Sequence, residues 1–252
     1  MADAGIGTVN LKVLVYDPDY YALQAINSYL AWDRRTRVKA MCETVKEMWN
    51  YLDRTPTAEH PDVAVIDADH FGRSQVLTEV IQRLHEIVKD IRVICLSHAG
   101  DPALIEAAAS AGARAFLLKH EVRLRIAWAL VYSLEQPFVI TQGVHRAAAH
   151  LFNSRVFHAV LLPEQREYPE MTERIQQALR LCVVEGMPAH LAADEMGISL
   201  HTIRGYIKEG YRILEAYDET DYPVDMTPQE RAFMRFTALE DENTPPNKHD
   251  YR

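Results

Sequence analysis

The sequence contains the stretch Val63-Ala64-Val65-Ile66-Asp67, in which four consecutive apolar residues end on an acid. An apolar run of this length is typical of a strand buried on both faces of a parallel sheet. Similar runs lie on either side of it, each followed by a stretch with helical periodicity, at residues 13–16, 38–41, 93–96 and 115–118. This alternation predicts an α/β fold, a doubly wound five-stranded parallel sheet over residues 11–136.

The segments between these runs carry helix signals. The apolar residues of 45–52 recur at the spacing of a helix that faces a core. Asp101 followed by Pro102 is an N-cap and first-turn pair, and Gly112 stands where that helix must end. The last helix of the sheet domain is predicted from Glu121 to Leu134.

The composition limits the class of protein. The chain has 252 residues, 48% of them hydrophobic, and no stretch reaches the roughly 18 consecutive apolar residues of a membrane-spanning helix. Its first ten residues lack the basic and apolar regions of an export signal. Cys42, Cys95 and Cys182 are far apart and show no metal-ligand spacing. We expect a soluble, cytoplasmic protein with reduced thiols and no membrane partner.

Beyond residue 136 the pattern changes. Residues 137–170 are mixed in character and predict a partly helical linker, whereas residues 171–217 are helical throughout. Residues 218–252 predict an acidic extension with one helix at about 228–240, because Thr227-Pro228-Gln229-Glu230 reads as a capping box. The net charge of the chain is -9, and residues 215–252 alone hold 10 acidic and 4 basic residues. The acidity is therefore concentrated at the end of the chain.

Polar residues follow the predicted strands directly. They are Asp17 with Asp19, Asp67 with Asp69, Ser97, and Lys119. Because the carboxyl ends of parallel strands meet at one edge of the sheet, we expect these side chains to converge in one crevice. Carboxylates that hold a hard cation, a hydroxyl and an ammonium suit phosphoryl transfer onto Asp67.

The order and spacing of these residues resemble the receiver domain of bacterial response regulators, a flavodoxin-like fold. The resemblance covers residues 11–134 and implies Asp67 as phosphoacceptor, Ser97 as switch hydroxyl, Phe116 as switch aromatic and Lys119 as the lysine of the site. The family has two adjacent acids after its first strand, whereas this chain has Asp17-Pro18. The metal site thus reduces to Asp17 and Asp67, so that Mg²⁺ is expected to bind weakly and no cofactor to be required. The crevice is either a phosphoacceptor site or a salt-bridged structural feature.

The same stretch also looks like the DxD motif of haloacid-dehalogenase-type phosphatases, with Asp67 as nucleophile and Asp69 as general acid. That family needs a further acidic pair after its lysine, but Lys119 is followed by His120-Glu121. The motif also belongs on the first strand of that fold. We expect no enzymatic activity.

The helical segment predicts a helix-turn-helix. A first helix over about 172–185 is followed by a short helix that begins at Pro188 and ends at Gly197, and Ser199 caps a third helix. Turning Ile203 and Ile207 of that helix toward a core leaves donor-rich residues outside. They are His201, Gly205, Lys208 and Arg212, with Thr202 and Arg204 at the sides.

This segment resembles the LuxR-type (NarL/FixJ) DNA-binding domain, in the register of Gly186, Gly197-Ile198-Ser199 and Thr202-Ile203-Arg204. The resemblance implies that Ser199 and Thr202 bind phosphates and that Arg204, Gly205 and Lys208 lie nearest the major groove. We expect a transcription regulator that binds promoter DNA as a homodimer, with a degenerate receiver that acts without phosphorylation. The alternatives are a phosphorylation-dependent two-component regulator, with a histidine kinase as partner, and an interaction scaffold that binds no DNA.

Overall fold

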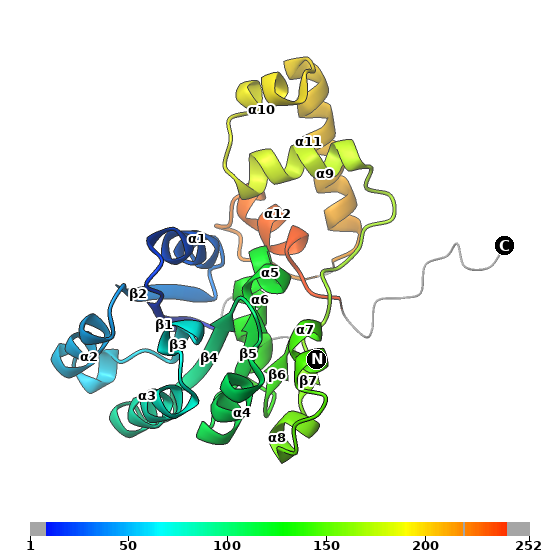
Figure 1. Cartoon of the computed structure of the whole chain (residues 1–252). Helices are drawn as coiled ribbons and strands as arrows, with labels where there is room; N and C mark the ends of the chain where they lie inside the picture. Colours follow the sequence, from blue (N-terminus) through cyan, green and yellow to red (C-terminus); the bar gives the residue numbers. More distant parts are fainter. Residues whose placement is uncertain (1–8, 219, 241–252) are drawn as a thin grey trace. The chain divides into compact units, whose positions relative to one another are not determined.

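The computed structural model describes residues 9–218 and 220–240, and the chain divides into two units between Leu162 and Pro163. The first unit is an α/β fold and the second is built mainly of helices (Figure 1). Both folds were predicted from the sequence, and both predictions are confirmed. Each unit is described by itself below.

Unit 1 contains one parallel sheet in the strand order β2-β1-β3-β4-β5-β6-β7. Strands β1 to β5 are the five apolar runs of the sequence, whereas β6 and β7 are two-residue strands added at one edge. The predicted number of five strands is therefore corrected to seven. The bounds are β1 Leu11–Tyr16, β2 Thr36–Cys42, β3 Val63–Asp67, β4 Arg92–Ser97, β5 Ala115–Leu118, β6 Val139–Ile140 and β7 Val160–Leu161.

Helices lie on both faces of this sheet (Figure 1). On one face α2, α3 and α4 enclose the main hydrophobic cluster, and on the other α1 contacts α6. The predicted helix at 121–134 is interrupted by a 3-10 turn, Arg123–Arg125. The first residue of this turn, Arg123, has a positive φ of 46°. The bounds are α1 Tyr20–Ala31, α2 Val45–Arg54, α3 Ser74–Ile87, α4 Pro102–Ala111, α5 Lys119–Val122, α6 Ile126–Ser133, α7 Gln142–Ala147 and α8 Ser154–Phe157.

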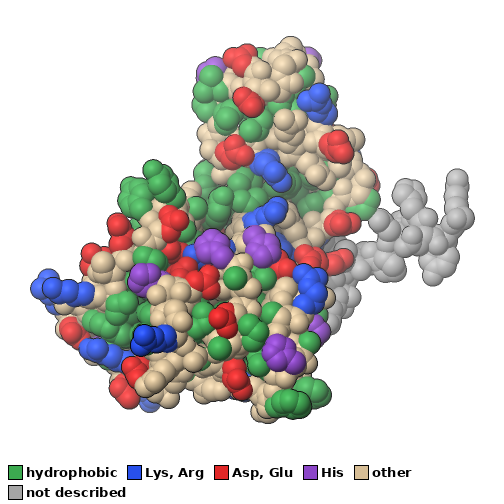
Figure 2. Space-filling model, in the orientation of Figure 1, with side chains coloured by type: hydrophobic (Ala, Val, Ile, Leu, Met, Phe, Trp, Pro, Cys, Tyr) green, Lys and Arg blue, Asp and Glu red, His purple; other side chains and the backbone are tan. Residues whose placement is uncertain are grey.

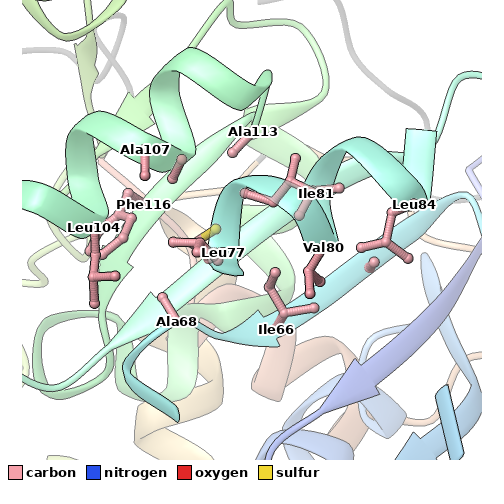
Figure 3. Packing of buried hydrophobic residues seen from close by; sticks show 14 of the residues in the cluster. Ile66, Ala68, Leu77, Val80, Ile81, Leu84, Leu104, Ala107, Ala113 and Phe116 are labelled. Atoms are coloured by element: carbon pink, nitrogen blue, oxygen red, sulfur yellow. The ribbon is translucent and has the colours of Figure 1, made fainter. Parts of the chain in front are cut away.

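The core between the sheet and α3 and α4 is built from apolar side chains of both layers (Figure 3). Ile66 and Phe116 are supplied by β3 and β5, and Leu77 and Ile81 by α3; all four are fully buried. Burying a side chain of this size stabilises the fold by about 1.5–3 kcal/mol. This core holds β3, β4 and β5 in register, so that their carboxyl ends lie side by side.

The structure differs from the expected linker at 137–170. Up to Leu162 this segment belongs to unit 1, where it supplies β6, α7, α8 and β7. Arg155 joins this segment to the rest of unit 1. Its guanidinium donates to the carbonyls of Ala109 at 2.6 Å, Ala113 at 2.8 Å and Pro137 at 2.6 Å. Arg155 thus bonds to carbonyls in the last turn of α4 and in the loop after it, which belong to residues 42–46 positions away.

Unit 2 has the three helices predicted for 171–217 and a fourth. They are α9 Glu173–Leu179, which continues as a π-helical turn at Arg180–Val184, α10 Ala189–Met196, α11 Leu200–Ala216 and α12 Pro228–Phe236. Gly197 has a φ of 65° and ends α10, and the Ser199 hydroxyl accepts from the N–H of Thr202 at 3.0 Å. The turn and the cap that define the helix-turn-helix are therefore those predicted from the sequence.

The predicted acidic extension contributes to the core of unit 2 over its described part. Helix α12 begins at the predicted capping box and ends at Phe236 rather than near 240. Phe233 is 1% exposed, the Tyr168 hydroxyl donates to the Arg235 carbonyl at 2.5 Å, and Leu239 forms an antiparallel bridge with Gln165. Residues 218 and 220–240 thus complete unit 2, while residues 241–252 lie outside the described part of the chain.

Candidate functional site

The predicted crevice in unit 1 brings Asp17, Asp67 and Lys119 together. They stand at the ends of β1, β3 and β5, and the ammonium of Lys119 lies 2.6 Å from Asp17 Oδ2 and 2.5 Å from Asp67 Oδ2. The side chains of the two acids are 2% and 6% exposed, and that of Lys119 is 13% exposed. A single buried ammonium therefore bridges two buried carboxylates.

The remaining oxygens of these carboxylates are also bonded. Asp17 Oδ1 accepts from the N–H of Asp19 at 2.9 Å, and Asp67 Oδ1 accepts from the N–H of His70 at 2.8 Å. Burial lowers the pKa of Lys119, but its hydrogen bonds to Asp17 and Asp67 outweigh burial and leave the pKa raised. All four carboxylate oxygens of Asp17 and Asp67 therefore accept a hydrogen bond, and the two acids share one ammonium.

The Lys119 ammonium bonds Oδ2 of both Asp17 and Asp67, which are two of the oxygens that a divalent cation would use. Asp19, the other acid after β1, caps α1 through the amides of Tyr21 at 2.8 Å and Ala22 at 3.2 Å. Within residues 9–218 and 220–240, no group of three or more His, Cys, Asp or Glu side chains is placed to hold a metal ion.

Ser97 is hydrogen-bonded to Asp69. Its hydroxyl donates to Asp69 Oδ1 at 2.6 Å, and Asp69 Oδ2 accepts from the N–H of His98 at 2.6 Å. The sequence predicted that both side chains lie in one crevice, but it indicated no contact between them and a chemical role for Asp69 only in the phosphatase alternative. In the structure both oxygens of Asp69 are engaged at the end of β4, which does not suit a general acid. The contact between Asp69 and Ser97 follows from the register of β3 against β4. Because Asp67 pairs with Leu96, the residues that follow Asp67 lie beside the end of β4.

Two aromatic residues lie beneath this region. Phe116, the predicted switch aromatic, is fully buried in the cluster under α3 and α4 (Figure 3). Tyr16, which the sequence analysis did not consider, is 1% exposed at the end of β1. Burial, and then the charges of Asp67 and Asp17, raise the pKa of Tyr16 to about 12. Among the described residues its hydroxyl has no hydrogen-bond partner.

Exposed histidines surround the buried cluster. His70, His98 and His120 follow β3, β4 and β5 within one to three residues. Figure 2 shows histidine side chains beside acidic ones on this part of unit 1. The crevice is thus acidic and ammonium-bridged inside, and its rim carries imidazoles.

In unit 2 the candidate nucleic-acid interface is one face of α11. Ile203, Ile213 and Leu214 are buried, and the opposite side exposes His201, Arg204, Gly205 and Lys208. A Cβ added at Gly205 would meet no atom within 4 Å, so this side of the helix is unobstructed at that point. The predicted division of α11 into an apolar and a donor-rich side is therefore present.

Three of the predicted contact residues at this helix have partners within the chain. Arg212 forms an ion pair with Glu209 at 2.7 Å and lies 3.6 Å from Glu170. The Ser199 and Thr202 hydroxyls lie 2.8 Å apart. Hydrogen bonding with Arg212 lowers the pKa of Glu209, and the same contact raises the pKa of Arg212. Arg204 and Lys208 are the basic residues of this face that remain available for phosphate or base contacts.

Gly210 has a packing role in α11. The residue is buried against Leu179 of α9. A Cβ at this position would lie 2.8 Å from Leu179 Cδ1. Glycine therefore allows α9 and α11 to approach closely, and this contact fixes the helix that carries the donor-rich face.

The two units define a chain that joins a receiver-like α/β fold to a helix-turn-helix fold, which are the two resemblances stated from the sequence. No protein-family model and no curated protein matches the chain. None of the described helices is long and apolar enough to cross a bilayer.

Solved structures similar to the chain are response regulators and their parts. The two-component response regulator RcsB, in a complex with DNA, is 18% identical over 89% of this chain and 98% of that chain, with a TM-score of 0.46. RcsB of Salmonella typhimurium is 17% identical over 85% and 95%, with a TM-score of 0.46. The isolated receiver domain of RcsB from Salmonella enterica serovar Typhimurium is 19% identical over 55% and 98%, with a TM-score of 0.45.

Proposed function

We propose that the protein is a DNA-binding transcription regulator of the response-regulator type, whose receiver-like unit acts without phosphorylation. The observation that carries the proposal is the exposed face of α11, where Arg204 and Lys208 flank the open side of Gly205. This face belongs to a helix whose N-cap, preceding glycine turn and buried side have the geometry of a helix-turn-helix.

The chemistry of the α11 face suits a duplex. Arginine donates in a fork that matches phosphate oxygens and the edge of guanine, and lysine supplies a point charge for phosphate. Gly205 allows the backbone of α11 to approach a groove closely, since no side chain keeps it away. The N–H groups at the start of a helix favour a phosphate as well. The α11 face therefore offers both positioning and sequence-reading contacts.

Phosphorylation of Asp67 is disfavoured by its bonding. An attacking carboxylate oxygen needs an available lone pair and its negative charge, but Oδ2 of Asp67 is bonded to Lys119 and Oδ1 to the N–H of His70, and both bonds lower the nucleophilicity of the carboxylate. The acid that would complete a cation site is absent, because Pro18 follows Asp17. For these reasons we favour a receiver-like unit that serves as a dimerisation or docking platform in a homodimer on paired half-sites of promoter DNA.

The DNA-binding proposal is tested with the double variant Arg204→Ala, Lys208→Ala. Binding sites are recovered from cells that express wild-type protein, and the affinity of both proteins for a recovered site is measured by fluorescence anisotropy at several salt concentrations. We expect the variant to bind at least tenfold more weakly and with a salt slope reduced by up to about 2, because about 0.9 ion is released per phosphate contact.

The control for this experiment is Lys46→Ala, Lys89→Ala, which removes two exposed lysines of unit 1 and the same net charge. We expect its affinity to stay within about twofold of wild type. Equal losses in both double variants would show that only net charge matters. Recovery of no DNA fragments by the wild type would favour the scaffold alternative.

The phosphorylation-independent part of the proposal has its own test. Wild-type protein is incubated with acetyl phosphate and Mg²⁺, and its intact mass is measured. We expect no added phosphate, with Asp67→Asn as the reference for any modification elsewhere. A wild-type protein that gains one phosphate, which Asp67→Asn does not gain, would establish the phosphorylation-dependent regulator instead.

A further inference from the structure

Asp69 makes an unusual contact for an acid at the end of a strand. It follows β3 in a short 3-10 turn, Asp69–Phe71, which Gly72 closes with a φ of 62°. The ladder of β3 and β4 continues through the N–H of Ala68, which donates to the Leu96 carbonyl at 2.8 Å. This register carries the Asp69 carboxylate across to the end of β4, where it receives two hydrogen bonds.

The two donors to Asp69 are held in place by the β4–α4 loop. The Ser97 hydroxyl accepts from the N–H of Gly100 at 3.0 Å and of Ala99 at 3.2 Å. Because both amides donate to this oxygen, its own proton is left to point at Asp69 Oδ1. The adjacent N–H of His98 points at Oδ2. Both contacts measure 2.6 Å, the short length of charge-assisted hydrogen bonds.

No cation neutralises this carboxylate. Lys119 is engaged by Asp17 and Asp67, and among the described residues no lysine or arginine forms an ion pair with Asp69. The negative charge of Asp69 is thus balanced by an oriented hydroxyl and a backbone amide alone. Two converging donors at the mouth of a crevice are the arrangement by which proteins hold an oxyanion.

We propose that the carboxylate of Asp69 is an internal ligand of the Ser97 hydroxyl and the His98 amide. Bound there, it holds the β4–α4 loop in one arrangement with no anion from solution. As a mode of regulation, this inference rests on the proposed function, because it explains how a receiver-like unit holds one state permanently.

The loop that Asp69 holds leads directly into α4. A Cβ at Gly100, which has a φ of 65°, would lie 3.3 Å from Leu118 Cδ2, so the loop packs tightly on the end of β5. Asp101 then caps α4 through the N–H of Ala103 at 2.8 Å. Release of the Ser97 and His98 contacts would therefore free the segment that fixes the start of α4.

The test is hydrogen exchange of the amides of residues 98–101 and 103, measured by mass spectrometry on the full chain. In Asp69→Ala we expect these amides to exchange at least tenfold faster than in wild type, while the amides of β3 and β4 stay protected. Sodium formate, which supplies the missing carboxylate, should return the exchange of the loop toward the wild-type rate. Sodium chloride at the same concentration should not.

Two further variants keep this test decisive. Asp69→Asn retains the shape and one acceptor oxygen, so we expect an intermediate rate; it replaces Asp69→Ala should that variant lose the protection of β3 and β4. Glu106→Gln, which changes an exposed acid of α4, should exchange as the wild type does. Wild-type exchange of the loop in both Asp69 variants, or faster exchange that formate leaves unchanged, would overturn the proposal. None of these readouts involves DNA, so failure of the α11 variant to change DNA affinity is a separate result.

Discussion

At the scale of single residues, the bonding in the crevice differs from what the order of the side chains implies. Lys119 bridges two carboxylates at once, and Asp69 engages Ser97, so that the two donors of the site have internal acceptors. The hydroxyl of Tyr16 is buried and has no hydrogen-bond partner within the described part of the chain. A buried hydroxyl without a hydrogen bond costs about 1–3 kcal/mol. The hydroxyl of Tyr16 therefore lowers the free energy of unfolding.

We predict that Tyr16→Phe raises the free energy of unfolding by about 1 kcal/mol at pH 8, because the unpaired hydroxyl is removed and the ring is kept. The pKa of Tyr16 is raised to about 12 from an ordinary value of 10.0, so its neutral form contributes stability that is complete below pH 10 and is lost as the pH rises toward 12. Urea denaturation at pH 8 and pH 11 should show a smaller alkaline loss in Tyr16→Phe than in wild type.

Tyr21→Phe is the matched control for this experiment, because Tyr21 is 82% exposed. Its loss of stability between pH 8 and pH 11 should equal that of the wild type. The raised pKa of Lys119 adds to the alkaline loss in all three proteins, since that contribution is also present at low pH and is lost above the ordinary value of 10.5. An alkaline loss in Tyr16→Phe as large as that of the wild type would contradict the prediction.

At the scale of elements, two glycines of α11 have opposite roles that the sequence does not distinguish. Gly205 faces open space, whereas Gly210 lies against Leu179 of α9. The caps at Asp101, Ser199 and Thr227 were predictable because each depends on local chain chemistry. The close approach at Gly210 was not, because it depends on a helix about 30 residues earlier in the chain.

The same difference between local signals and contacts distant in sequence explains why the strands at the edge of the sheet were not predicted. The five strands β1 to β5 were predictable from runs of apolar residues, but β6 and β7 have two residues each and leave no periodicity to detect. Strand β6 depends on pairing with β5, β7 depends on pairing with β6, and the segment also depends on the carbonyl contacts of Arg155. In the crevice, the convergence of Asp17, Asp67 and Lys119 followed from topology, whereas the partner of Ser97 required the register of two strands.

We predict that alanine at the two glycine positions changes stability in opposite directions. Gly205→Ala should raise the free energy of unfolding of unit 2 by about 0.5–1 kcal/mol, because alanine is the better helix former and meets no atom. Gly210→Ala should lower it by about 1–3 kcal/mol, because the new Cβ would lie 2.8 Å from Leu179 Cδ1. Urea denaturation followed by far-ultraviolet circular dichroism measures both. Equal effects of the two substitutions would refute the packing role of Gly210.

At the scale of the whole molecule, the chain consists of two units with separate cores, and the segment after α11 belongs to the second. Helix α12 and residues 238–240 close unit 2 on residues 164–166 through the carbonyls of Ala238 and Glu164. From its acidic composition, the segment after α11 was predicted to be an extension of the helix-turn-helix domain. The structure shows instead that its described residues are part of the core of unit 2. The reason is that the apolar face of α12 is carried by a minority of its residues, among them Phe233 and Phe236.

We predict that Phe233→Ala lowers the stability of unit 2 by about 3–5 kcal/mol and leaves unit 1 unchanged, because Phe233 is 1% exposed within the second core. Hydrogen exchange should then show loss of protection in α11 with full protection in β3 and β4. DNA affinity should fall together with the loss in α11. Val224→Ala, at a position 103% exposed, is the control and should match the wild type. Equal loss of protection in both units would contradict the division into two cores.

The bridge between Gln165 and Leu239 has a consequence for synthesis. A chain leaves the ribosome from its first residue onward, and domains generally fold as units in that order. The sheet is complete once Leu161 has emerged, but the helices that follow receive their closing partner only when Leu239 is made. Translation that stops between these two points releases a chain with a complete sheet unit and an unfinished helix-turn-helix unit. We therefore expect a stable helix-turn-helix unit only in chains that are translated as far as Leu239.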